Sequence, residues 1–109
     1  MPLSNAQIRT LRSEAHRLML KPVVMIGQNG LSENVINELQ QALEHHELIK
    51  VRVPAADKQE KSAMIDAICQ QLQADLIQSI GHVIVIFKSN PKIGRFKKLL
   101  AGKKPSATD

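Results

Sequence analysis

The feature that most constrains the fold is an apolar run that stops at a glycine-bounded loop, in the stretch VVMIGQNGLS at residues 23–32. Bulky and β-branched side chains in an unbroken run are typical of a buried strand. Gly27 and Gly30 can adopt positive φ angles, so the backbone between them can turn tightly and approach another molecule closely. Ser32 is placed to cap a following helix, with Leu31 and Ile36 as a hydrophobic staple. The stretch therefore predicts a strand, a tight loop and a helix N-terminus, where backbone N–H groups can bind an anion such as phosphate.

Hydrophobic periodicity predicts one helix before this stretch and several elements after it. A capping-box pattern begins at Ser4 and is followed by apolar residues at helical spacing, which predicts a helix from about Asn5 to about Leu20 that ends before Pro22. The further elements are strands over residues 23–26, 48–53, 76–80 and 83–87, and helices over residues 33–44 and 58–72.

This order, a helix followed by βαβαββ, predicts an α/β fold with a four-stranded mixed sheet. Two strand–helix–strand units imply right-handed crossovers, and a closing hairpin through Gly81 and His82 adds an antiparallel pair. The unbroken apolar runs at residues 23–26 and 83–87 predict strands that are covered on both faces. We expect the first helix to share in that cover.

The net charge of +5 is distributed unevenly along the 109 residues. Residues 1–88 hold nine Lys or Arg and nine Asp or Glu, whereas residues 89–109 hold six Lys or Arg and a single acid, Asp109. Because the hydrophobic pattern also ends after Lys88, we expect one domain over residues 1–88 and a poorly ordered basic tail over residues 89–109. Four apolar residues of the tail are spaced to form a short helical face on a partner, namely Ile93, Phe96, Leu99 and Leu100.

Positive charge also gathers on the first helix. At about 100° per residue, Arg9, Arg12 and His16 fall beside one another on the flank of its apolar face. Such a stripe is by default a solvated helix face. Lys21, however, continues the same charge toward the glycine loop, so we expect the stripe and the loop to share a side that attracts a polyanion.

Further cations are candidates for the same surface. Alternation in the second strand directs Lys50 and Arg52 away from the core, onto a face that a helix can cover. The tail cations would add affinity for a polyanion without specificity, and the candidates among them are Lys92, Arg95, Lys97 and Lys98.

The sequence gives little support to an enzyme. His45 and His46 are adjacent, which is the wrong spacing for one helix face, and no cluster of Cys or carboxylates accompanies them as a metal site requires. Residues 44–47 instead predict a polar helix C-terminus. His82 in a turn and Cys69 on a helix edge have no local group to activate them. We expect no catalytic residue, metal, cofactor, small-molecule substrate or membrane contact, and a cytoplasmic location.

The glycine loop itself fits neither common nucleotide motif. A P-loop needs Lys and Ser or Thr directly after its last glycine, where Leu31 and Ser32 stand. A dinucleotide fingerprint needs a third glycine at the position of Glu33. What remains is a GxxG loop, the device with which KH domains clamp a nucleic-acid backbone. A simple turn without a ligand is the alternative.

Three blocks of the sequence resemble a known family. They are KPVVMIGQNGL at residues 21–31, ALEHHELIKV at residues 42–51 and IGHVIVIFK at residues 80–88. In this order they are similar to YhbY-type proteins, which are bacterial single-domain members of the CRM (chloroplast RNA splicing and ribosome maturation) RNA-binding family. The resemblance covers most of residues 4–88. The family's GxxG loop then falls on residues 27–30, and its basic first helix on Arg9, Arg12 and His16.

The resemblance implies a fold like that of the C-terminal domain of bacterial translation initiation factor three. It also implies RNA binding, association with precursors of the large ribosomal subunit, a part in ribosome assembly, and no catalysis. We expect a monomer in which backbone N–H groups of the loop hold phosphate and Gln28 and Asn29 bond sugar or phosphate. Two alternatives remain, a protein–protein adaptor that docks its tail and acidic second helix on ribosomal proteins, and a small nuclease.

Overall fold

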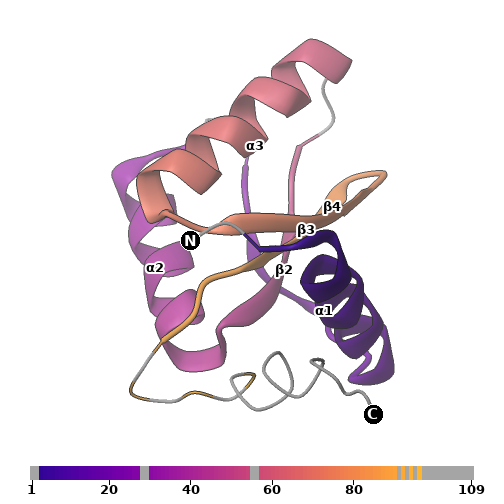
Figure 1. Ribbon diagram of the computed structural model, residues 1–109. Coiled ribbons are helices and arrows are strands. Elements are labelled where there is room, and N and C mark those ends of the chain that lie inside the picture. Colours follow the sequence, from indigo (N-terminus) through magenta and orange to yellow (C-terminus); the bar gives the residue numbers. More distant parts are fainter. Residues whose placement is uncertain are drawn as a thin grey trace, which may run out of the picture.

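In the computed structural model of the chain, helices lie on both faces of one mixed sheet (Figure 1). The structure describes residues 3–27, 30–54 and 57–90, together with Lys92, Gly94 and Phe96. Within these ranges the elements are α1 (Asn5–Arg17), β1 (Pro22–Met25), α2 (Glu33–His46), β2 (Leu48–Arg52), α3 (Lys58–Leu72), β3 (Asp75–Ile80) and β4 (Val83–Phe87). The predicted α/β order, a helix followed by βαβαββ, is confirmed.

The sheet has the strand order β1-β2-β4-β3. β1 and β2 are parallel, and β4 lies between β2 and β3, antiparallel to both. Hence β2 and β3 are themselves parallel, and the hairpin strand β4 fills the space that the second crossover leaves between them. The predicted four-stranded mixed sheet with a closing hairpin is confirmed.

One face of the sheet is closed by α2 and α3. Leu39 and Leu43 of α2 and Ile68 of α3 are at most 1% exposed, and they pack against Val51 and Ile84 of the central strands. The caps that start these helices are Ser32, whose side chain accepts from the Val35 N–H, and Asp57, whose side chain accepts from the Glu60 N–H. Burial of this apolar face is the main contribution to the stability of both helices.

The other face is covered only in part, by α1. Leu11 and Ala15 of this helix pack on Leu48, Val85 and Phe87 in a second core cluster. The predicted capping box is present, since Ser4 and Gln7 exchange side-chain to backbone hydrogen bonds. α1 therefore shares in the cover of the sheet, as the sequence predicts, but it packs against β2 and β3 and leaves the region near β1 open.

The expectation that residues 23–26 are covered on both faces is wrong. Val23 and Met25 are 52% and 68% exposed, whereas Val24 and Ile26 are buried. The reason is that β1 is an edge strand and α1 packs mainly on β2 and β3, so the face that carries Met25 is left open. Val23 lies at the irregular pairing between Pro22 and Val24. The same expectation holds for β4, a central strand whose residues 84–87 are all buried.

Two helix ends differ from the sequence prediction. α1 ends at Arg17, three residues before the predicted Leu20, because the chain turns at Met19, which has a φ of +52°. The Leu20 N–H donates to the Ala15 carbonyl at 3.3 Å, which closes this turn. α2 continues to His46, two residues past the predicted end.

Glu47 follows α2 and joins it to the segment after β4. Residues 44–47 are predicted to form a polar helix C-terminus, but Glu47 is only 1% exposed. Its Oε2 accepts from the Asn90 N–H at 2.6 Å, and its carbonyl accepts from the Lys88 N–H at 2.9 Å. The Asn90 side chain also donates to the Glu44 carbonyl at 2.7 Å. The first residues beyond β4 are therefore fixed to the end of α2.

The boundary between domain and tail at residue 88 stays a prediction, but Phe96 does not face a partner as expected. Its ring is 4% exposed and meets the ring of Phe87 edge to face, with the centroids 5.9 Å apart. Phe96 thus belongs to the core under α1. The other residues of the expected tail face lie outside the described residues, namely Ile93, Leu99 and Leu100.

Candidate functional site

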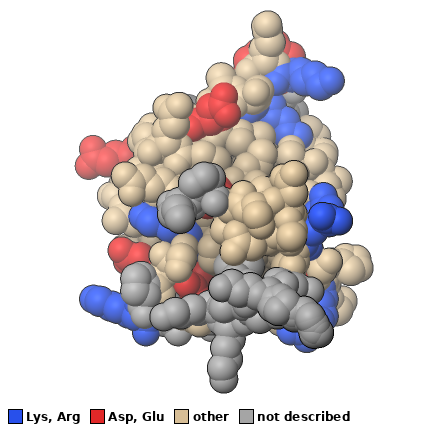
Figure 2. Space-filling view, in the orientation of Figure 1, with Lys and Arg blue, Asp and Glu red and all other residues tan. Residues whose placement is uncertain are grey.

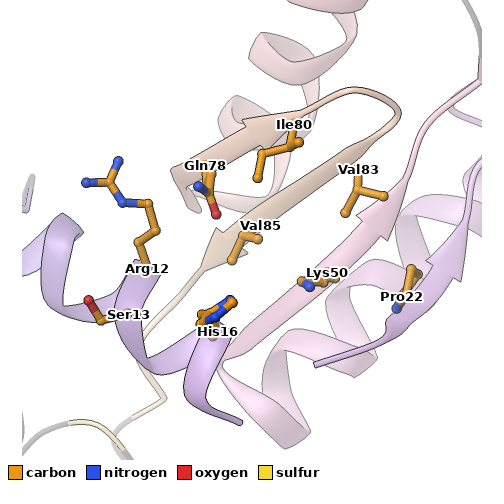
Figure 3. Close-up of a pocket in the computed structure, with 10 residues that line it drawn as sticks. Arg12, Ser13, His16, Pro22, Lys50, Gln78, Ile80, Val83 and Val85 are labelled. Atoms are coloured by element: carbon orange, nitrogen blue, oxygen red, sulfur yellow. The ribbon is translucent and has the colours of Figure 1, made fainter. Parts of the chain in front are cut away.

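A groove of about 590 Å³ lies where α1 crosses the sheet and leaves part of its face open (Figure 3). Arg12, Ser13 and His16 of α1 form one wall. The floor and the opposite side come from the sheet, with Lys50 at the centre and apolar side chains of β3 and β4 around it. The groove therefore combines residues that are far apart in the chain.

Strand register decides which side chains form this floor. Lys50 pairs with Val85, and Val85 pairs with Gln78, so these three side chains form one row on the α1 face. The next row, toward the hairpin, is Met25, Arg52, Val83 and Ile80. α1 lies over the first row and stops short of the second, so Arg52 and Ile80 are exposed.

Among the described residues that line the groove, the charged side chains are Arg12 and Lys50, both cations. Arg12 and His16 are exposed and lie one turn apart on α1, and Lys50 is half-buried. In the part of the chain that the structure describes, the only ion pair joins Arg17 to Glu14. The hydrogen bond and charge of Glu14 raise the pKa of Arg17. No described carboxylate pairs with Arg12 or Lys50 in this way, so the groove presents their positive charge to solvent.

The other cations predicted on this side lie around the groove. Arg9 is exposed on α1, three residues before Arg12. Lys21 is exposed directly before Pro22, which lines the groove. Arg52 belongs to the open row of the sheet face. Together with the basic residues that line the groove, they make up what we call the cationic face (Arg9, Arg12, His16, Lys21, Lys50 and Arg52).

Of the four tail cations predicted for this surface, only Lys92 is among the described residues, and it lies elsewhere. Lys92 is exposed and lines a different pocket of about 350 Å³, beside Glu44 and Asn90 at the C-terminal end of α2. Three further candidates lie outside the described residues, namely Arg95, Lys97 and Lys98.

Acidic side chains lie on the opposite side of the molecule. α2 carries Glu33, Glu38 and Glu44 and neither Lys nor Arg. In Figure 2 the red side chains lie toward the top and left, whereas blue ones lie at the lower right, where α1 lies, and also at the top and lower left. The molecule is therefore polarised, and a polyanion approaches the cationic face more favourably than the α2 and α3 side.

The glycine loop starts at the open end of the cationic face. The Ile26 N–H donates to the Arg52 carbonyl at 2.8 Å, which holds the beginning of the loop beside β2. The Gly30 N–H donates to the Gly27 carbonyl at 3.0 Å, and the Ser32 N–H to the Gly30 carbonyl at 3.1 Å. Gln28 and Asn29 lie outside the described residues.

These hydrogen bonds reduce the number of loop N–H groups that are available to bind an anion. Two of the N–H groups of the loop, those of Gly30 and Ser32, are engaged within it. Glu33 also places a carboxylate in the first turn of α2, at the positive end of the helix dipole. Phosphate binding by loop N–H groups therefore stays a prediction, and the side chains of the cationic face supply the positive field.

The two described glycines of the loop differ in how well they can be replaced by a residue with a side chain. Gly30 has a φ of +78°, which strains any L-residue, whereas a Cβ at Gly27 meets no atom within 4 Å. We predict that Gly30→Ala lowers the free energy of unfolding by about 1 kcal/mol, because the alanine must hold this backbone conformation. Gly27→Ala should change it by less than about 0.5 kcal/mol. Thermal unfolding of both variants measures the difference, and equal melting temperatures would contradict the loop geometry.

The described residues show little that could serve catalysis. They contain no group of three or more His, Cys, Asp or Glu arranged to hold a metal ion. Burial raises the pKa of the Cys69 thiol, and the charges of Asp75 and Asp66 raise it further, so this thiol stays protonated at neutral pH. In the same part of the chain no helix has both the length and the apolar character to cross a membrane.

Fold and groove together define a small α/β domain with one cationic sheet face opposite the acidic helix α2. Residues 3–88 match the model of the CRS1/YhbY (CRM) domain family. This match covers more than half of the chain, and the chain belongs to this family. The family resemblance seen in the sequence is thereby confirmed.

Curated proteins similar to this chain carry a consistent name. A Pseudomonas aeruginosa protein named "Probable RNA-binding protein" is 41% identical over 84% of this chain and 86% of its own length. A Haemophilus influenzae protein named "RNA-binding protein" is 46% identical over 79% of this chain and 85% of its own length. The solution structure of a Staphylococcus aureus protein matches with a TM-score of 0.71 and 35% identity, over 82% of this chain and 91% of that one.

The sequence did not reveal the floor of the groove. Gln78, Ile80, Val83 and Val85 read as ordinary strand residues, and only the register across β4 brings them beside Lys50.

Proposed function

We propose that this chain binds RNA on its cationic face and through its glycine loop, and that its RNA is the ribosomal RNA of large-subunit precursors during ribosome assembly. Membership of the CRM domain family and the names of the curated relatives support RNA as the ligand. The observation that carries the proposal is the groove, which Arg12 and His16 of α1 and Lys50 of β2 line together, with no acidic residue among its described lining residues.

Binding of this kind rests on the sugar–phosphate backbone. Each phosphate that a cation neutralises releases counterions. The logarithm of the affinity therefore falls by about 0.7 to 0.9 per phosphate contact for each tenfold rise in salt concentration. Lys50 is half-buried at the centre of the groove, and Arg9 and Arg12 extend the positive surface along α1. Such contacts read the shape of a folded RNA more than its sequence. We propose that the chain acts as a monomer in the cytoplasm and without catalysis.

Crosslinking in cell lysate, followed by sequencing of the bound RNA, tests this function. Gly27→Glu is the informative variant, because the site has room for a side chain and the carboxylate would repel phosphate at the loop. Gln40→Glu is the matched control, since it adds the same charge at an exposed position of α2, on the acidic side.

We predict crosslinks to large-subunit precursor RNA from the wild type and from Gln40→Glu, and loss of most of them from Gly27→Glu. Equal crosslinking by the two variants would remove the loop from the interface. If RNase treatment left the ribosomal proteins bound to this chain, the adaptor function would replace RNA binding.

A further inference from the structure

The floor of the groove is more apolar than backbone binding requires. Phosphates and sugars are met by charged and polar groups, yet Ile80, Val83 and Val85 line the groove together with its cations. Ile80 is 62% exposed, and Met25 in the same cross-strand row is 68% exposed. An apolar surface that stays open beside cations fits a ligand that is itself partly apolar.

The groove is also built before any ligand arrives. Val83 and Val85 belong to the central strand β4, which is hydrogen-bonded on both sides. The hairpin that carries Ile80 and Val83 is held to α3 by a hydrogen bond from the Lys61 ammonium to the Gly81 carbonyl. A volume of about 590 Å³ lies within the range of roughly 300 to 1,000 Å³ found for sites that enclose ligands about the size of a nucleotide.

Planar groups stand at the edge of this floor. Arg12 and His16 are four residues apart on α1, and both line the groove. Unpaired RNA bases stack on aromatic rings, including histidine, and on arginine guanidinium planes. Gln78, on the far side, offers an amide with both donors and an acceptor for the edge of a base. The chain has neither Trp nor Tyr, so Arg12 and His16 are the planar groups available here.

Charge decides which apolar ligand fits. The described lining of the groove contains Arg12, Lys50 and His16 and no acidic side chain, and Lys50 is half-buried beside apolar neighbours. A half-buried ammonium is stabilised by an anion close to it. A nucleotide supplies both parts, an apolar base for the floor and a phosphate for the cations, whereas a neutral apolar peptide would leave Lys50 without a counter-charge.

We propose that this groove binds one unpaired nucleotide of the RNA. Its base lies on Ile80 and Val83 beside the ring of His16, and its phosphate lies against Lys50 and Arg12. The chain therefore prefers RNA with a bulged or looped-out nucleotide over a continuous duplex. This inference rests on the proposed function, since it names the kind of RNA that the cationic face selects.

The experiment compares three RNA hairpins by fluorescence anisotropy with the full chain. One has a single bulged nucleotide, one has an abasic bulge at the same position, and one has a fully paired stem. The abasic RNA keeps the backbone and charge of the bulge and lacks only the base. We expect the bulged RNA to bind about tenfold more tightly than the abasic one, the order of magnitude that stacking of one base contributes.

Two matched variants locate the base. Ile80→Glu places a carboxylate in the floor, whereas Leu76→Glu adds the same charge on the same strand but on the other face, because Leu76 pairs with Ile86 of the α2 and α3 core. Both positions are exposed, so both variants should fold. The affinity for the bulged RNA divided by that for the abasic RNA should fall to about one in Ile80→Glu and stay near ten in Leu76→Glu.

Three other results would contradict this inference. Equal binding of the bulged and abasic RNAs by the wild type would overturn this inference and leave RNA binding in place. Binding of none of the three RNAs at low salt would overturn both. If the wild type sediments as a dimer without RNA, and Ile80→Glu sediments as a monomer, the groove holds a second copy of the chain and the inference is wrong.

Discussion

Replacing Arg12 and Lys50 together by Gln is expected to lower RNA affinity roughly 30-fold at about 0.1 M salt, because two phosphate contacts and their counterion release are lost. The slope of the logarithm of affinity against the logarithm of salt concentration should fall in magnitude by about 1.4 to 1.8. Both side chains line the groove, and neither is paired with a carboxylate within the described residues. A salt titration of binding to one structured RNA measures both quantities.

The control removes the same charge elsewhere. Arg17 lies on the same helix but is paired with Glu14, and Lys58 is exposed at the start of α3, on the acidic side. Arg17→Gln with Lys58→Gln should lower the affinity by only a few-fold, through the change in net charge. If the two double variants weaken binding equally, the RNA responds to overall charge and the groove has no special part.

Leu39→Ala should cause the largest loss of stability. Leu39 is 0% exposed and packs between α2 and the sheet in the main core. Removing its side chain leaves a cavity and should lower the free energy of unfolding by about 3 kcal/mol. For a domain of this size the melting temperature should fall by about 10 to 20 °C. Thermal unfolding followed by circular dichroism gives the change.

Leu76→Ala is the matched substitution on the surface. It removes the same atoms from a side chain that is 38% exposed on the edge strand β3, so the cost should stay below about 1 kcal/mol. A melting temperature of Leu39→Ala within 3 °C of that of Leu76→Ala, by the same scaling of about 4 to 8 °C per kcal/mol, would contradict the packing of α2 on the sheet.

Local signals in the sequence were sufficient for the order of the elements. The bounds of α3 agree with the prediction at both ends, since its apolar residues recur at helical spacing. Ser4 and Ser32 act as the predicted N-caps, because capping depends on a few neighbouring residues. The hairpin through Gly81 and His82 is present for the same reason.

Features that depend on distant residues were predicted less well. The run at residues 23–26 looks like a strand buried on both faces, but its place at the sheet edge leaves Val23 and Met25 exposed. Glu47 looks like a surface residue, and its burial depends on Asn90, far along the chain. Neither sheet position nor a contact between residues 43 positions apart is encoded in a local pattern.

The candidate site also contains one part that local sequence patterns predicted and one part that depends on distant residues. The cations of the cationic face were predicted, since helical spacing aligns Arg12 with His16 and strand alternation turns Lys50 outward. The groove between them was not, because it requires β4 to lie between β2 and β3 and α1 to stop short of the last row of the sheet. The apolar floor, with Ile80 at its end, follows from that topology alone.

RNA bound on the cationic face would change the environment of specific backbone amides. We would therefore titrate the ¹⁵N-labelled chain with a structured RNA that carries an unpaired nucleotide and follow the amide resonances by NMR. The largest changes should occur at Ser13, Gln78 and Val83 around the groove and at Gly27 in the loop. Changes confined to α2 and α3, with the groove amides unmoved, would contradict RNA binding on this face.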